Sequence, residues 1–263
     1  MSRQNYYARR RVRRAQAVAA ELIIELVQAE RRVQPRLGTR KLRVMLQGAM
    51  VEAGVALGRD RFFKVLRQGG LLLAPLPKNY PQTTSSHHCL PVFANLVKDR
   101  AVKRPNEVWV SDLTYVRTEE GFLYLALVTD QYSRKIVGYH CGETLEAVGC
   151  VRALRMALRG LPARAHPIHH SDQGSQYCCH EYVQALASRG LPISMTVTDH
   201  CAENALAERM NGILKGEYGL GQTLKTKALA RQLADQGVLL YNTRRPHSAL
   251  QYQTPDRVHS LAE

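Results

Sequence analysis

The chain has 263 residues and a formal net charge of +15 at pH 7. Its length is enough to bury the core of one ordinary domain and a smaller module. No apolar run is long enough for a signal or membrane segment, and the six cysteines include no CxxC pair. The sequence therefore predicts a cytoplasmic protein with reduced thiols and no membrane partner.

The positive charge is concentrated in the first part of the chain. Residues 1–104 carry 21 lysines and arginines against six acids, whereas residues 105–263 carry equal numbers of each. Such an excess attracts polyanions, so we expect a nucleic-acid-binding region joined to a neutral second domain. A basic tail that only aids solubility is the alternative. Apolar residues in helical spacing beyond residue 35 favour a folded module instead.

The first segment is an arginine-rich arm. Arg3–Arg14 holds six arginines and no acid, beside Tyr6 and Tyr7, and runs into residues 15–30, whose apolar spacing is helical. Arginine with neighbouring aromatic side chains suits a phosphate backbone. This arm is therefore the first candidate for DNA contact.

Two short helices are predicted next. Residues 37–46 form an amphipathic helix with Thr39 as its cap, Gly48 and Gly54 interrupt the chain, and a second helix begins near Arg59. The second helix directs apolar side chains inward, namely Phe62, Phe63 and Leu66. Its opposite face is basic, with Arg59, Arg61, Lys64 and Arg67. This pattern predicts a helix-turn-helix DNA reader, with the ordinary solvated face of a small helical domain as the alternative.

Residues 74–105 show no sustained helical or strand periodicity, which predicts a linker. They contain five prolines, Pro75, Pro77, Pro81, Pro91 and Pro105. His87, His88 and Cys89 suggest a zinc site as an alternative. No second pair of ligands follows at zinc-finger spacing, which favours a plain linker.

From Asn106 the pattern changes to strands and helices of a mixed α/β domain. Three strands joined by hairpins come first, then a helix, a strand, a helix, a short strand and two helices. The expected ranges are 108–117, 122–129, 135–141, 144–159, 167–171, 177–188, 193–196, 204–215 and 225–242.

Three acidic residues are candidate metal ligands because of their positions in the predicted strands and helices. Asp112 lies inside the first strand, Asp172 follows the fourth, and Glu208 lies within a helix. If the first and fourth strands are neighbours, the two aspartates meet and a helix across that edge adds the glutamate. Converging carboxylates repel one another unless a divalent cation compensates, and Mg²⁺ prefers such oxygen ligands. Two such ions activate an attacking oxygen and stabilise a leaving one.

Other acids and a histidine compete with this interpretation. Asp130 is an alternative first carboxylate, but it lies at a strand end beside a turn, where aspartate commonly caps the backbone. His170 either orients the site or is a core histidine. Glu203 and Glu217 are interpreted as surface charges.

The strings WVSDLTYV at 109–116, HHSDQGSQY at 169–177 and AENALAERMNGILKGEY at 202–218 resemble the acidic triad of retroviral integrases and related transposases. The 35 residues between Asp172 and Glu208 add to that resemblance. VTDQYSRKIVGY at 128–139 and YNTRRPHSALQYQTP at 241–255 resemble the second-frame protein of the insertion sequence 3 family. The resemblance covers nearly the whole chain. Thr196–Glu203 departs from the basic, glycine-containing stretch of many relatives, which leaves the contacts of that loop open.

The resemblance implies an RNase H-like catalytic core with a mixed five-stranded sheet at residues 106–220. A helix-turn-helix DNA-binding region at 1–73, the linker at 74–105 and a helical extension at 221–263 complete the expected organisation. The implied activity is DNA transposition, in which the protein cleaves at insertion-sequence ends and transfers the strand to target DNA. Asp112, Asp172 and Glu208 would hold two Mg²⁺ or Mn²⁺ ions.

The resemblance also implies partners. They are terminal repeats and target DNA, further copies of the chain on DNA, and an upstream-frame partner or a frameshift fusion, at the bacterial nucleoid. A nuclease that uses the same triad and a non-catalytic DNA-binding regulator are the rival functions.

Further DNA contacts are predicted around the triad. Glu208 shares a helix face with Asn204, Asn211 and Lys215, and we expect that face to meet DNA, with Lys215 on a phosphate as in integrases. A solvated stripe is the alternative. Arg244 and Arg245 follow the last helix, where DNA-end binding and structural packing are both open.

Overall fold

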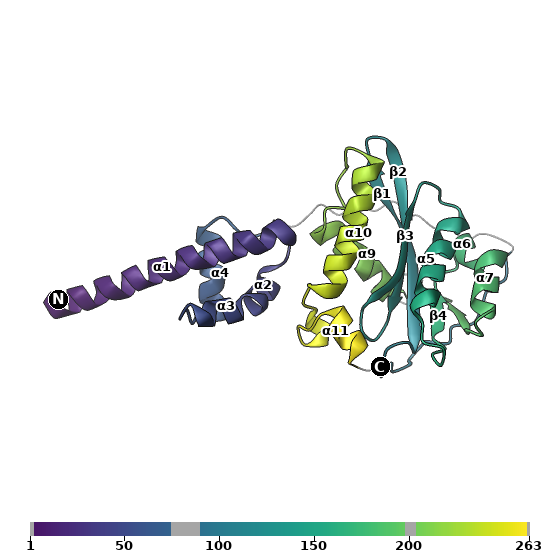
Figure 1. Cartoon of the computed structure of the whole chain (residues 1–263), viewed down its shortest axis with the longest axis horizontal. Coiled ribbons are helices and arrows are strands. Elements are labelled where there is room, and N and C mark those ends of the chain that lie inside the picture. The colour runs from purple at the N-terminus through teal and green to yellow at the C-terminus, as the bar shows by residue number, and fades with distance from the viewer. Residues whose placement is uncertain (1–2, 75–89, 198–203, 262–263) are drawn as a thin grey trace. The chain divides into compact units, whose positions relative to one another are not determined.

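The computed structural model in Figure 1 describes residues 3–74, 90–197 and 204–261. The chain divides into two compact units, Met1–Pro77 and Lys78–Glu263, which we describe separately. The histidine pair with Cys89 considered as zinc ligands, and Glu203, lie outside the described residues. No helix in the described ranges is both long and apolar enough to cross a membrane.

The first unit is helical. Its helices are α1 (Arg3–Val33), α2 (Thr39–Met45), α3 (Gln47–Glu52) and α4 (Arg59–Gln68). Their shared core holds Ile23, Val27, Leu37, Leu42, Phe62 and Leu66. The arginine-rich arm is thus the first part of α1, and residues 3–18 of that helix are exposed throughout.

Several local expectations in this unit are wrong. Gly38 in extended conformation precedes α2, and no side chain caps that helix, so Thr39 is its first residue rather than its cap. Gly48 lies inside α3 instead of breaking the chain, because Met50 on the same helix packs into the core. In α4, Phe62 is buried as expected and Phe63 is only half-buried.

The second unit contains a five-stranded sheet. Its strands are β1 (Val108–Thr118), β2 (Gly121–Asp130), β3 (Ile136–Gly142), β4 (Ile168–Ser171) and β5 (Ile193–Met195), in the order β3-β2-β1-β4-β5. β1, β2 and β3 pair antiparallel as two hairpins, and β4 and β5 add in parallel. The expected mixed sheet, with its first and fourth strands adjacent, is confirmed.

Helices cover both faces of the sheet (Figure 1). α5 (Ala147–Gly160), α6 (Ser175–Cys178) and α7 (His180–Ala187) form one core with the sheet, and α9 (Ala205–Glu217) and α10 (Lys227–Thr243) form the other. A 3-10 turn at Ser248–Leu250 and α11 (Pro255–Ser260) end the chain. The single helix expected at 177–188 is two helices, because Cys179 between them is extended.

The two segments that flank the expected catalytic core pack against it. In the described part of the linker, residues 90–105 contain no helix or strand, yet the Leu96 amide donates to Ser194 Oγ on β5 at 2.8 Å. Phe93 packs against the core on the α5 face. In the C-terminal segment, Val238 and Tyr241 of α10 share a core with α9 and β2.

Candidate active site

Sheet register brings Asp112 and Asp172 together. β1 and β4 run parallel with Val110 paired to His170, so each aspartate lies two residues further along its chain. Burial and, next, the negative charge of Asp172 raise the pKa of Asp112 to about 7, and Glu208 makes a smaller contribution in the same direction. The three acids therefore interact electrostatically, and Asp112 and Asp172 interact most.

Backbone and amide groups hold the two aspartates in place. Asp112 Oδ1 accepts a hydrogen bond from the Leu113 amide at 2.9 Å, and Asp112 Oδ2 accepts one from Asn211 Nδ2 at 2.7 Å. Asp172 Oδ1 accepts from the Gly174 amide at 3.0 Å. The two bonds to Asp112 oppose the effect of burial on its pKa, because they stabilise the charged form of the carboxylate.

Helix α9 lies across β1 beside the aspartates. Asn204 Nδ2 donates to the Ser111 carbonyl at 3.1 Å, one residue before the carboxylate that Asn211 contacts. Glu208 lies between these two asparagines on the helix and is exposed. Two hydrogen bonds spaced two helical turns apart thus fix the rotation of α9, and with it the position of Glu208.

The polar face of α9 is largely turned toward the sheet. Asn204 and Asn211 were expected to contact DNA, but they are 3% and 6% exposed and bond to β1. Lys215 is also buried, and its Nζ lies 4.1 Å from the centre of the Tyr115 ring. Burial lowers the pKa of Lys215 to about 8, against the opposing effect of Asp112. Helical spacing showed that these residues share a face and did not show what that face meets.

The donor set suits a divalent cation, although the three acids are not gathered as direct ligands. In the ranges that the structure describes, no three His, Cys, Asp or Glu side chains are arranged to hold a metal ion. The paired aspartates supply carboxylate oxygens, which hard cations prefer. A cation between them would also offset the repulsion that, together with burial, raises the pKa of Asp112.

Buried histidines lie behind the aspartates. His169 Nε2 shares hydrogen bonds with Ser111 Oγ at 2.7 Å and Tyr182 Oη at 2.8 Å, and burial lowers the pKa of His169 to about 3. His170 Nδ1 bonds to Ser194 Oγ at 2.9 Å. His170 is thus a core histidine. The sequence analysis missed His169 and Ser111, because only the parallel pairing of β1 and β4 brings them together.

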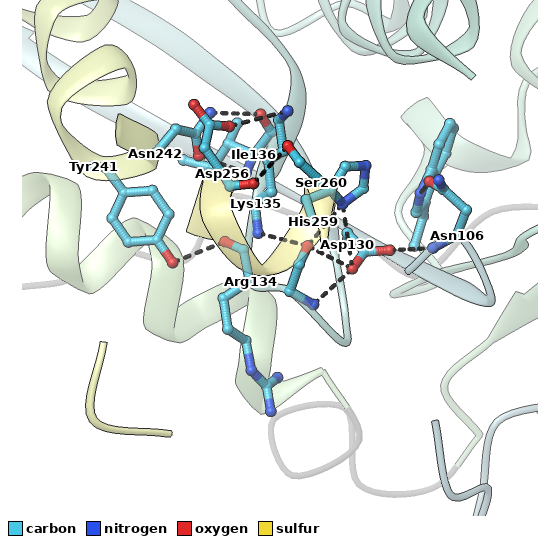
Figure 2. A network of polar contacts seen from close by, with 12 residues as sticks. Asn106, Asp130, Arg134, Lys135, Ile136, Tyr241, Asn242, Asp256, His259 and Ser260 are labelled. Carbon is cyan, nitrogen blue, oxygen red and sulfur yellow. Dashed lines mark hydrogen bonds and ion pairs between the residues drawn. The ribbon is translucent and has the colours of Figure 1, made fainter. Parts of the chain in front are cut away.

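Asp130 has a structural role at the β2–β3 turn. Its Oδ1 accepts from both the amide and the hydroxyl of Ser133 at 2.7 Å, and its Oδ2 accepts from the Asn106 amide at 2.7 Å (Figure 2). The expectation that Asp130 caps the backbone is confirmed.

Arg245 is held inside the protein. Its Nε and Nη2 donate to the two carboxylate oxygens of Glu217 at 2.6 and 2.7 Å, and the arginine is 2% exposed. Of the two open interpretations of Arg245, the structure favours packing over DNA-end binding. The interpretation of Glu217 as a surface charge is wrong. Arg244 is exposed.

We expect Asn211→Ala to reduce DNA strand transfer by about 10- to 100-fold, because the Asp112 carboxylate then loses the donor that orients it. The measurement is the rate of strand transfer, with the melting temperature recorded for each variant. Gln184→Ala, on the exposed side of α7, is the matched control, since it removes an amide side chain that makes none of the hydrogen bonds of the site. An equal loss in both variants would contradict an orienting role for Asn211.

Comparison with known proteins agrees with this fold. Residues 102–201 match the integrase core domain family, and residues 189–255 match a second family of the same description. The chain is 37% identical over 250 residues to the insertion element IS600 uncharacterized 31 kDa protein of Shigella sonnei, covering 92% of this chain and 89% of that protein. It is 34% identical to the transposase InsF for insertion sequence IS3A of Escherichia coli strain K12, covering 69% of this chain and 63% of that relative.

A solved structure shares the fold. The simian T-cell lymphotropic virus intasome in complex with PP2A regulatory subunit B56 gamma matches with a TM-score of 0.52 at 16% identity, covering 84% of this chain and 70% of that chain. The fold and the matched families define an integrase-type polynucleotidyl transferase. The chain belongs to the insertion sequence 3 family of transposases, and its activity is DNA transposition.

Proposed function

We propose that Asp112, Asp172 and Glu208 are the catalytic residues of this transposase and the ligands of two Mg²⁺ or Mn²⁺ ions. The observation that carries the proposal is that Asp112 on β1 and Asp172, just after β4, each follow the paired residues Val110 and His170 by two positions and interact electrostatically. The hydrogen bonds from Asn204 and Asn211 support it, because they set α9, and with it Glu208, across the same strand.

The chain's own residues orient the reacting groups. Asn211 and the Leu113 amide hold the Asp112 carboxylate, and the Gly174 amide holds that of Asp172. When bound, the ions supply positive charge to the attacking and leaving oxygens. A water oxygen bonds to phosphorus at the element end as the bond to the leaving oxygen breaks, which frees a 3′-hydroxyl. The oxygen of that hydroxyl then bonds to a target phosphorus as the bond from that phosphorus to the target strand's own 3′ oxygen breaks, and no covalent protein intermediate is required.

The first unit would hold the DNA. Four basic side chains of α4, namely Arg59, Arg61, Lys64 and Arg67, are exposed, and the apolar side chains of the same helix pack into the core. A short helix with one buried and one basic face suits insertion into a groove, so we propose that α2–α4 act as a helix-turn-helix reader. We further propose that several copies assemble on the terminal repeats and the target, alone or fused to an upstream-frame partner.

The test uses the purified full chain with labelled duplex DNA that carries the ends of its own element. We expect nicked and joined products in Mg²⁺ or Mn²⁺ and none in EDTA. Nicked products without joining would indicate a nuclease. Binding without cleavage, both alone and with the upstream-frame protein, would indicate a DNA-binding regulator and overturn the proposal.

A further inference from the structure

A hollow of about 600 Å³, which none of the three triad acids lines, lies between the β2–β3 turn and the C-terminal segment. The turn contributes Gln131, Tyr132 and Arg134, and the C-terminal segment contributes Gln251 and Gln253. These residues come from the sequence strings at 128–139 and 241–255, whose roles the triad does not explain. The volume lies within the range of small-ligand sites.

Buried contacts hold both walls of this hollow in place. Asn242 pairs with the backbone of Ile136 like a strand residue, accepting from its amide at 3.0 Å and donating to its carbonyl at 2.9 Å. Tyr241 Oη donates to the Arg134 carbonyl at 2.8 Å (Figure 2). Ser133 Oγ and His259 Nδ1 are 2.9 Å apart and join the turn to α11. The hollow is therefore built on a fixed framework.

Backbone strain is concentrated at the same place. Arg134 has a φ of +64°, Gln251 one of +53° and Tyr252 one of +62°, although none of them is glycine. Such conformations persist only where the surrounding structure enforces them, and they cluster at functional sites. At Arg134 and Gln251 they orient two side chains that line the hollow.

Arg134 brings a positive charge to the hollow; the negative charge of Asp130 acts on it, but no salt bridge joins the two side chains among the described residues. Its Nε is buried and has no hydrogen-bond partner in the part of the chain that the structure describes. The Arg134 side chain extends away from the carboxylate of Asp130, whose oxygens are occupied by Ser133 and Asn106 (Figure 2). No acidic residue is among those that line the hollow. The lining thus favours an anion.

We propose that this hollow binds one nucleotide of a DNA strand, with the phosphate on the Arg134 guanidinium. Arginine presents several N–H donors in a planar fork that fits phosphate oxygens. The amide groups of Gln131, Gln251 and Gln253 supply donors and acceptors for the sugar and base of the same nucleotide. The enzyme therefore has a strand-binding site in its second unit besides the triad and the basic first unit.

The test measures DNA binding by the full chain in EDTA, so that it does not depend on cleavage or on the triad. Fluorescence anisotropy with a labelled oligonucleotide is recorded over a series of salt concentrations. We expect Arg134→Gln to weaken binding and to reduce the slope of log affinity against log salt by about 1, the loss of one phosphate contact. Arg164→Gln, at an exposed position in the loop before β4, is the matched control and should leave affinity and slope unchanged.

A second variant keeps the test decisive if Arg134→Gln does not fold. Gln251→Glu adds a negative charge at the exposed rim of the hollow and should weaken binding about tenfold at low salt, the effect of repelling one phosphate. Gln236→Glu, on the exposed side of α10, adds the same charge elsewhere. Equal binding by Gln251→Glu and Gln236→Glu, or an unchanged salt slope in a folded Arg134→Gln protein, would overturn the proposal.

Discussion

Asp112→Asn is expected to lower the rates of DNA cleavage and joining by at least about 10³-fold while leaving DNA binding intact. The amide keeps the shape of the carboxylate and one acceptor oxygen for Leu113 or Asn211, so the substitution removes the negative charge and one hydrogen bond. The measurement is the yield of nicked and joined products in Mg²⁺, with binding measured separately in EDTA. Glu181→Gln, on the exposed surface of α7, is the matched control.

Although Asp112→Asn should abolish activity, it should not lower the stability of the protein. The folded-state pKa of Asp112 is raised to about 7, so the folded protein binds a proton more tightly than the unfolded chain, and stability falls as pH rises from about 4 to 7. In EDTA at pH 8, Asp112→Asn should therefore melt no lower than the wild type. A folded variant that retains cleavage would contradict the assignment of Asp112 to the triad, and a variant that melts lower than the wild type would contradict the stability prediction.

Arg245→Met is expected to lower the free energy of unfolding by about 3–5 kcal/mol, because it leaves the Glu217 carboxylate without its partner in a largely buried position. Arg244→Met changes the neighbouring, exposed arginine and should alter stability by no more than about 0.5 kcal/mol. Urea unfolding of the two variants makes the comparison.

This pair of variants also separates the two interpretations of the segment after α10. If Arg245 served DNA, Arg245→Met would unfold like the wild type and bind DNA more weakly. If it serves packing, as its two hydrogen bonds to Glu217 indicate, stability falls and any change in DNA binding follows the fraction of folded protein.

Local sequence patterns correctly predicted many of the strands and helices of the second unit. Alternating apolar residues and hairpin turns predicted β1, β2 and β3 within about two residues, because strand periodicity and turn chemistry are both local properties. The spacing of Asn211 and Lys215 correctly placed both on one face of α9, which is buried, whereas Glu208 at the same spacing is exposed. The break between α6 and α7 was missed, because a single extended residue leaves no signal in an apolar pattern.

The sequence by itself determined the order of elements, the acidic triad as candidates and the concentration of basic charge before residue 105. Only the tertiary structure decided that Asn211 contacts Asp112, that Arg245 lies buried against Glu217 and that Arg134 lines a hollow with Gln251. The physical reason is that side-chain periodicity records which residues share a face. What that face meets depends on contacts between segments far apart in the chain, and these exist only after folding.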